Sequence, residues 1–194
     1  MSNNVFSYDG ETGFEGIWTG ITASRGFAPC LLDPPKEATH WVRYTGGATA
    51  ALQVGEILTG GTSSATCRLV AIAVENGTAG SSDSGIILIN NISGTLVAET
   101  LTGTLSTGTV AIAQAPILLG VYGPPKAALF TVEGFAIHVS LSGTTPTVAA
   151  GTNFGVSVGV GGSITVRGIG NIRKVRLINE VNASGSIVKY VLLW

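Results

Sequence analysis

The sequence predicts an all-β protein: an antiparallel β-sandwich, jelly-roll-like, with a small β-barrel or hairpin module inserted into it. Charged residues make up only 11% of 194 residues, and the 28 glycines stand among many threonines, serines, valines and isoleucines, a composition typical of short strands and tight turns. No stretch shows a 3.6-residue hydrophobic period, so we expect helices to be short or absent. In addition, one polar and apolar phrase occurs twice in the chain.

The chain divides into three expected parts. Residues 1–33 are polar and punctuated by glycine, which predicts an N-terminal arm and an edge strand within GIWTGITAS. Residues 34–47 and 116–194 predict the main β-sandwich, and each part carries the phrase PPK. Residues 48–115 lie between them and predict the inserted β module with two related hairpins.

The repeated phrase reads EILTGGTSSAT at residues 56–66 and ETLTGTLSTGT at residues 99–109, an offset of 43. Each copy runs into a second strand after a turn of small polar residues, which predicts a hairpin. We expect the leucines to face a core, the glycines to permit the turns, and the serines and threonines to satisfy turn backbone. These leucines and glycines are Leu58, Leu101, Gly60 and Gly103.

Two further segments carry structural predictions. ENGTAGSSDSG, residues 75–85, is small and polar and predicts an exposed, mobile loop tip. VRLINEV and IVKYVLLW flank NASGS, which predicts a closing hairpin. The apolar residues expected to share a face in each of these strands are Val175, Leu177 and Val181, and then Val188, Tyr190, Leu192 and Trp194.

Charge and hydropathy limit the possible partners. The net charge is −1, so there is no global field to attract nucleic acid or an anionic membrane, and we expect neither as a partner. The mean hydropathy is +0.45, but no apolar run reaches the ~18 residues that a membrane-spanning helix needs, and MSNNVFSYDGETG lacks the pattern of an export signal. High hydropathy with few charges instead predicts a surface that is covered by other protein subunits.

The basic residues and cysteines leave alternatives open. The late basic residues predict a solvated strand face, salt bridges to a partner chain, or a phosphate-binding patch. They are Arg167, Arg173, Lys174, Arg176 and Lys189. Cys30 and Cys67 lack C-x-x-C spacing; two free thiols in a reducing compartment are the default, and one disulfide stays possible.

No motif supports catalysis, a metal or a cofactor. GVSVG, residues 155–159, matches the G-x-S-x-G nucleophile elbow, but no histidine or aspartate follows Ser157, and a strand follows where a helix is required. His40 and His138 have no second ligand at metal spacing, which favours ordinary strand positions. We therefore expect no enzyme. The tryptophans could stack on sugars, but core or interface packing is the commoner use.

The phrase G-E-x-L-T-G-x-x-S-x-A-T, residues 55–66, resembles a repeat phrase of virion structural proteins of tailed bacteriophages. In that family it builds small β-barrels or hairpin modules of head-decoration, tail and baseplate components. The closing IRKVRLINEVNASGSIVKYVLLW is similar to the C-terminal hairpin of small phage decoration proteins. The resemblance implies a structural role and no catalytic residue.

Composition and resemblance together predict a capsid decoration, or cement, protein, made in the bacterial host cytoplasm and located on the outer capsid surface. Its expected partners are the major capsid protein and itself, as a homotrimer. Candidate capsid contacts are Phe6, Tyr8, Phe14, Trp18, Arg173, Lys174 and Arg176. Candidate oligomer contacts are Tyr190, Leu192 and Trp194. The alternatives are a tail, neck or baseplate component, a host-binding appendage, or a carbohydrate-binding module.

Overall fold

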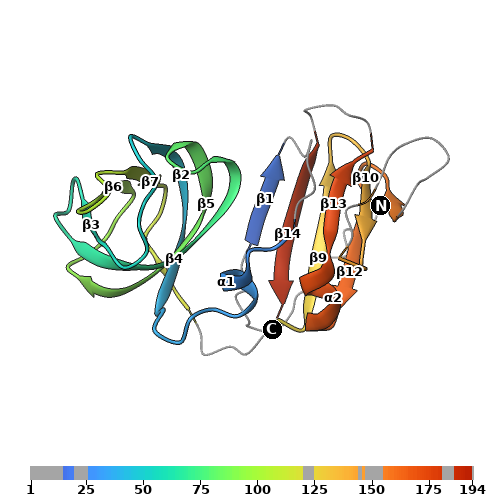
Figure 1. The fold of residues 1–194 in the computed structure, drawn as a ribbon, viewed down its shortest axis with the longest axis horizontal. Coiled ribbons are helices and arrows are strands. Elements are labelled where there is room, and N and C mark those ends of the chain that lie inside the picture. The colour runs from blue at the N-terminus through green and yellow to red at the C-terminus, as the bar shows by residue number, and fades with distance from the viewer. Residues whose placement is uncertain are drawn as a thin grey trace, which may run out of the picture.

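The computed structural model describes residues 15–19, 26–119, 125–143, 146, 155–180 and 186–193, which form two β bodies side by side (Figure 1). The first body contains β2 (His40–Ala48), β3 (Ile57–Gly60), β4 (Thr66–Thr78), β5 (Ser81–Ser93), β6 (Glu99–Gly103), β7 (Thr109–Ile112) and β8 (Ile117–Leu118). The second contains β1 (Glu15–Thr19), β9 (Ala127–Glu133), β10 (Ile137–Ser140), β11 (Val156–Val158), β12 (Ser163–Arg167), β13 (Arg176–Asn179) and β14 (Ile187–Leu193). Two short helices, α1 (Pro29–Leu32) and α2 (Ile169–Lys174), complete the described elements.

The first body is a closed barrel. Its strands follow the order β5-β4-β3-β6-β7-β2, and β2 also pairs with β5, so the ring closes, with β8 beside β2. β2 pairs with β5 along one edge, through residues 40–44, and with β8 and β7 along the other edge, through residues 40–41 and 44–48. Its register shifts between Thr45 and Ala48, where Gly46 has a φ of 64°, a left-handed conformation that glycine adopts without strain.

Side chains of all six barrel strands fill its interior. Leu58 and Leu101 are fully buried there, which confirms that the leucines of the repeated phrase face a core. The interior cluster comprises Val42, Tyr44, Leu52, Leu58, Ala65, Cys67, Leu69, Ile87, Ile89, Leu96, Leu101, Val110 and Ile112. The barrel therefore has a hydrophobic core of its own, as period-two alternation requires.

The second body consists of a four-stranded sheet, β1-β14-β9-β12, and a three-stranded sheet, β11-β10-β13. Neighbouring strands in both sheets are antiparallel, so the predicted all-β antiparallel class is confirmed. Both sheets contribute to one buried cluster, which continues onto the outer face of the barrel through side chains such as Trp41, Val70 and Leu88. The two bodies are thus joined by shared core rather than by a linker alone.

The chain enters and leaves the barrel at neighbouring points. The backbone N–H of Leu119 donates a hydrogen bond to the carbonyl oxygen of Thr39 at 2.8 Å. Residues 34–47 were expected in the sandwich, but β2 pairs with β5 and β7, so residues 40–48 belong to the barrel. Alternation alone could not place this strand, because its outward Trp41 is also buried, against the second body.

The predicted closing hairpin is wrong, although both of its strands form. β13 pairs with β10, whereas β14 pairs with β1 and β9, so the chain crosses between sheets at this point. Leu177 and Tyr190 are both buried, as their alternation predicts. Two strands that each have one buried face can pair with each other or belong to different sheets that share a core. The alternation of apolar and polar residues is the same in both cases, so it could not distinguish them. Val181 and the NASGS turn lie outside the described residues apart from Ser186.

Candidate functional site

Charge is distributed unevenly over the barrel. Residues 48–115, all of which the structure describes, contain five charged side chains, and four of these are buried carboxylates. The four are Glu56, Glu75, Asp83 and Glu99. The fifth, Arg68, has 41% of its side chain exposed and lies 4.0 Å from Glu37. The surface of this segment therefore carries a single formal charge.

One face of the barrel is uncharged. The outward residues of β3, β6 and β7 form it, and we name it the threonine face; they are Ile57, Thr59, Thr100, Thr102, Thr109 and Ala111. Strand register places Thr59 beside Thr102, and Thr102 beside Thr109. These side chains carry no charge, so a protein partner can cover the face without burying ions, provided that it gives hydrogen-bond partners to the threonine hydroxyls.

The glutamate of the second phrase holds the turn of the first. The Glu99 carboxylate accepts hydrogen bonds from the backbone N–H groups of Thr62 and Ser63 at 2.9 and 3.0 Å and from the Ser63 hydroxyl at 2.6 Å. A further bond comes from the N–H of Val97 at 3.2 Å. The Ser63 hydroxyl accepts in turn from the N–H of Ala65 at 3.0 Å, so the serine satisfies turn backbone as expected.

The glutamate of the first phrase holds the turn of the second in the same way. The Glu56 carboxylate accepts from the N–H groups of Leu105 and Ser106, each at 3.0 Å, and from the Ser106 hydroxyl at 2.8 Å. The N–H of Gln53 adds a bond of 2.6 Å. The N–H of Gly108 donates to the Ser106 hydroxyl at 3.1 Å, as Ala65 does in the first turn.

The glycines of the phrase leave room for these carboxylates. A Cβ on Gly60 would lie 2.4 Å from the Oε2 atom of Glu99, and one on Gly103 would lie 2.4 Å from the Oε2 atom of Glu56. The exchange follows from the antiparallel pairing of β3 with β6, which relates the two phrases by a local twofold axis. A methyl group at either position would displace the opposite carboxylate from its donors.

The expected role of these glycines as turn residues is wrong. The left-handed positions of the two turns are Ser64, with a φ of 57°, and Thr107, with a φ of 58°. Gly60 and Gly103 precede them at the strand ends, where they face the barrel interior. Sequence reasoning therefore found the repeat and missed the two carboxylates that it serves.

Both turn-holding glutamates ionise easily. Burial by itself would raise the pKa of Glu99, but the serine hydroxyl and the backbone N–H groups outweigh it and lower the pKa from 4.5 to about 2. The pKa of Glu56 is also lowered: burial opposes the shift, and the N–H groups around it produce it. A carboxylate that accepts several N–H bonds favours its charged form, so both groups are held as anions.

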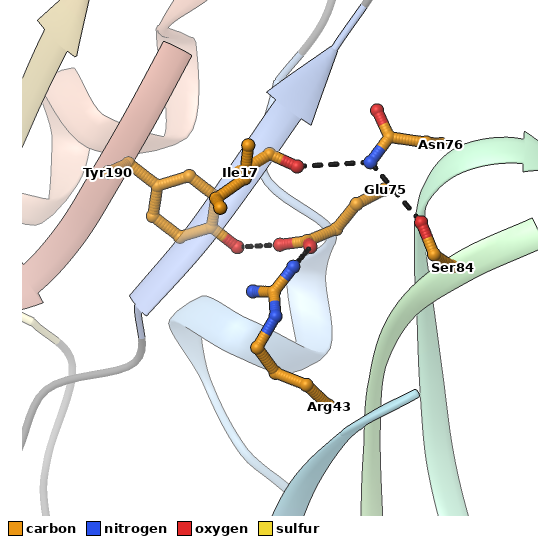
Figure 2. Close-up of polar contacts among 6 residues, drawn as sticks. All are labelled: Ile17, Arg43, Glu75, Asn76, Ser84 and Tyr190. Atoms are coloured by element: carbon orange, nitrogen blue, oxygen red, sulfur yellow. Dashed lines mark hydrogen bonds and ion pairs between the residues drawn. The ribbon is translucent and has the colours of Figure 1, made fainter. Parts of the chain in front are cut away.

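A third buried carboxylate joins the two bodies (Figure 2). Glu75 on β4 has 2% of its side chain exposed and pairs with the Arg43 guanidinium of β2 at 2.6 Å. It also accepts a hydrogen bond from the hydroxyl of Tyr190 on β14, in the second body. Burial raises the pKa of Glu75, whereas the charge of Arg43 and the bond from Tyr190 act in the opposite direction.

The same junction covers an edge strand. The side-chain amide of Asn76 donates to the carbonyl oxygen of Ile17 on β1 at 3.0 Å (Figure 2). The backbone of Ile17 also bonds to Glu75. Two consecutive side chains of β4 thus occupy backbone groups that an additional strand would take. Because unpaired strand edges invite pairing with other chains, this arrangement protects the edge of β1 at Ile17.

The predicted loop at residues 75–85 is instead a paired hairpin, and exposure is confined to its tip at residues 77–79, 81 and 82. β4 continues to Thr78 and β5 begins at Ser81, with both strands paired. Asp83, in the middle of the segment, is buried and accepts a hydrogen bond from the hydroxyl of Tyr44 at 2.7 Å. A run of small polar residues is typical of a loop. In this chain it forms a long hairpin, and its small side chains let the hairpin fit closely against the second body.

The candidate contact residues divide into three groups. Phe6, Tyr8, Phe14 and Trp194 lie outside the described residues. Trp18, Tyr190 and Leu192 are at most 3% exposed, so these side chains offer a partner almost no surface. Trp18 stacks on Tyr190 with ring centroids 4.9 Å apart, and Phe27 and Phe130 complete the aromatic cluster. These rings form core between the bodies.

The basic candidates lie at one end of the second body. Arg173 and Lys174 are exposed in the last turn of α2, and Arg176 follows on β13. The guanidinium of Arg176 donates to the carbonyl oxygens of Val175 at 2.7 Å and Arg173 at 3.3 Å, which satisfies backbone at the end of the helix. Arg176 is thus partly committed to structure, while Arg173 and Lys174 face solvent.

Ser157, in the segment that matches the nucleophile elbow, lies near a carboxylate and a histidine, but the three groups do not have the geometry of a catalytic triad. Ser157 donates to Glu180 at 3.3 Å, and His138 Nε2 lies 3.4 Å from the same carboxylate. In a hydrolase triad the histidine stands between the serine and the carboxylate, because it takes the serine proton. Here the carboxylate stands in the middle, so this arrangement does not activate Ser157.

Other kinds of site find no support in the described part of the chain. It contains no group of three or more histidine, cysteine, aspartate or glutamate side chains placed to hold a metal. Cys30 and Cys67 are free thiols. Trp18 and Trp41 are buried, so neither can stack on a sugar. None of the described helices is long and apolar enough to span a membrane.

Comparisons of the chain with protein-family models, with curated proteins and with solved structures gave no match.

Proposed function

We propose that the chain is a structural protein of a tailed-bacteriophage virion that binds the outer capsid surface and bridges neighbouring capsid subunits. The observation that carries the proposal is the barrel surface, on which residues 48–115 expose one formal charge, Arg68. Protein interfaces are depleted in charged side chains, and a free surface with so few would favour association. The likeness of the repeated phrase to virion proteins supports this class of assembly.

The way in which the two bodies are joined suits a bridging role. A bridge stabilises a shell only if its two attachment surfaces keep a fixed spacing. Shared core and the buried Glu75–Tyr190 bond hold the barrel against the second body. The proposed contacts are the threonine face toward one subunit and a second surface toward its neighbour or toward further copies in a homotrimer. Burial of apolar area would supply ~25 cal/mol per Å² before the cost of association.

The test uses heads of the phage that encodes the chain, assembled without it. We expect the purified protein to sediment with these heads, and we expect Thr102→Glu to reduce its binding at least tenfold by placing a charge on the threonine face. Thr165→Glu is the matched control, because Thr165 is an exposed threonine on β12 of the other body. It should bind as the unmodified protein does.

Electron microscopy of the same mixture separates the alternatives. Density on the outer capsid surface supports the decoration role. Density confined to the tail, neck or baseplate contradicts it and assigns the chain to those structures. If Thr102→Glu binds heads as well as Thr165→Glu does, the threonine face is not the attachment surface.

A further inference from the structure

The formal charge of the chain conceals a positive surface. The sequence sums to −1, but four carboxylates are buried inside the barrel and at the junction. Among the side chains that the structure describes, nine lysines and arginines are exposed or half-buried. Only four carboxylates are exposed or half-buried, namely Asp33, Glu37, Glu133 and Glu180. The described surface is therefore net positive by five charges, nine minus four.

Most of this excess gathers at one end of the second body, which we name the basic end; it comprises Lys126, Arg167, Arg173, Lys174 and Arg176. Backbone hydrogen bonding brings these residues together. The N–H of Gly168 donates to the carbonyl oxygen of Lys126 at 2.8 Å, and the Asn171 side chain donates to that of Arg167 at 3.0 Å. α2 connects this point to β13.

No described carboxylate lies within ion-pair distance, 4.0 Å, of the five basic side chains. Of the other four described lysines and arginines, three have a described carboxylate within that distance, namely Arg43, Arg68 and Lys189; Lys36 does not. Arg173 and Lys174 gain something from the carbonyl end of α2, which favours positive charge. That explanation does not extend to Lys126 and Arg167, which belong to the ends of strands.

We propose that the basic end binds a carboxylate-rich surface of a partner protein. No described carboxylate offsets these five cations, which repel one another, and an anionic partner relieves that repulsion while accepting bidentate hydrogen bonds from Arg167 and Arg173. The inference rests on surface charge and holds whether or not the partner is a capsid.

A protein partner fits this surface better than nucleic acid does. Single strands are held by aromatic side chains on which bases stack, and the exposed aromatic side chain of the described region, Phe135, lies beyond the opposite end of β9 from Lys126. A duplex is followed by a stripe of cations, whereas the barrel surface beyond the basic end offers Arg68 alone over residues 48–115.

The test measures binding of two fluorescent probes of equal charge by anisotropy at about 150 mM salt, where surface charges are screened beyond about 8 Å. One probe is a peptide of nine Glu-Ser repeats with capped termini, and the other is a single-stranded decanucleotide without a terminal phosphate, so each carries nine negative charges. We expect the peptide to bind the full chain more tightly than the decanucleotide. R173E/K174E should weaken peptide binding at least tenfold, and Arg68→Glu on the barrel should change it less than twofold.

A second variant guards against local unfolding, since glutamates in the last turn of α2 oppose the helix dipole. K126E/R167E changes the same surface from the strand ends and should weaken peptide binding to a similar degree. Tighter binding of the decanucleotide overturns the proposal in favour of nucleic acid. Absence of peptide binding, or equal losses in Arg68→Glu and R173E/K174E, also overturns it. None of these outcomes depends on binding to heads.

Discussion

The two bodies place their charges in opposite ways. The barrel buries four carboxylates, in its interior and at the junction, and leaves a surface almost without charge, whereas the described lysine, arginine and glutamate side chains of β9 to β14 and α2 are all exposed or half-buried. The difference arises from what each body must satisfy. Two of the buried carboxylates, Glu56 and Glu99, accept from the N–H groups of the barrel's tight turns, and a carboxylate is a strong acceptor for several N–H groups at once. The second body closes over aromatic and aliphatic side chains, so its charges remain available to partners.

The largest loss of stability is expected from Gly60→Ala, which puts a methyl group where the Glu99 carboxylate lies. Overpacking of a tight site and loss of hydrogen bonds to buried donors should together cost about 4 kcal/mol of unfolding free energy. Gly61→Ala is the matched control, because its Cβ would meet its nearest neighbour, the Thr100 carbonyl oxygen, at 3.4 Å. Urea denaturation measures both. A loss below 1 kcal/mol for Gly60→Ala would contradict the assigned role of the glycine.

A smaller effect is expected from Glu99→Gln, which keeps the shape of the side chain and replaces one acceptor oxygen by a donor. An amide oxygen at the Oε2 position keeps the N–H groups of Thr62 and Ser63, but the amide NH2 then faces the Val97 N–H and the Ser63 hydroxyl that bonded to Oε1, at a cost of about 2.5 kcal/mol. The control in the second body is Glu133→Gln, whose exposed ion pair with Lys189 contributes less than about 1 kcal/mol. Equal losses in the two variants would remove the contrast between inward and outward charge.

Acid should weaken the barrel through the same group. The pKa of Glu99 is about 2 in the folded chain, against an ordinary value of 4.5. A lowered folded pKa contributes stability that is complete above the unfolded pKa and is lost as pH falls through the folded one. The difference in unfolding free energy between the unmodified chain and Glu99→Gln should therefore be constant above pH ~5 and shrink between pH ~4.5 and ~2. A constant difference down to pH ~2 would contradict the assignment.

The sequence predicted the features that depend on local pattern. The duplicated phrase predicted two hairpins, and β3 with β4 and β6 with β7 form them. The pattern could not show that the glutamate of each copy serves the turn of the other, because that depends on the pairing of β3 with β6. The late basic residues could be identified in the sequence. The excess of cations over carboxylates on the surface could not, because net charge counts buried and exposed carboxylates alike. Glu75 was hidden for a related reason, since its partner Tyr190 is 115 residues away.

The smallest effect should come from the one carboxylate that both bodies share. Tyr190→Phe removes the hydroxyl that donates to Glu75 and should cost about 1.5 kcal/mol, because Glu75 keeps its ion pair with Arg43. Tyr44→Phe is the matched control, since its hydroxyl donates to Asp83 within the barrel. Similar losses of stability are expected, but hydrogen exchange should separate the two variants. Loss of the Tyr190 bond loosens Glu75 and so should speed exchange at Ile17, which bonds to Glu75, while Tyr44→Phe leaves it unchanged. Unchanged exchange at Ile17 in both variants would mean that shared core alone holds the barrel against the second body.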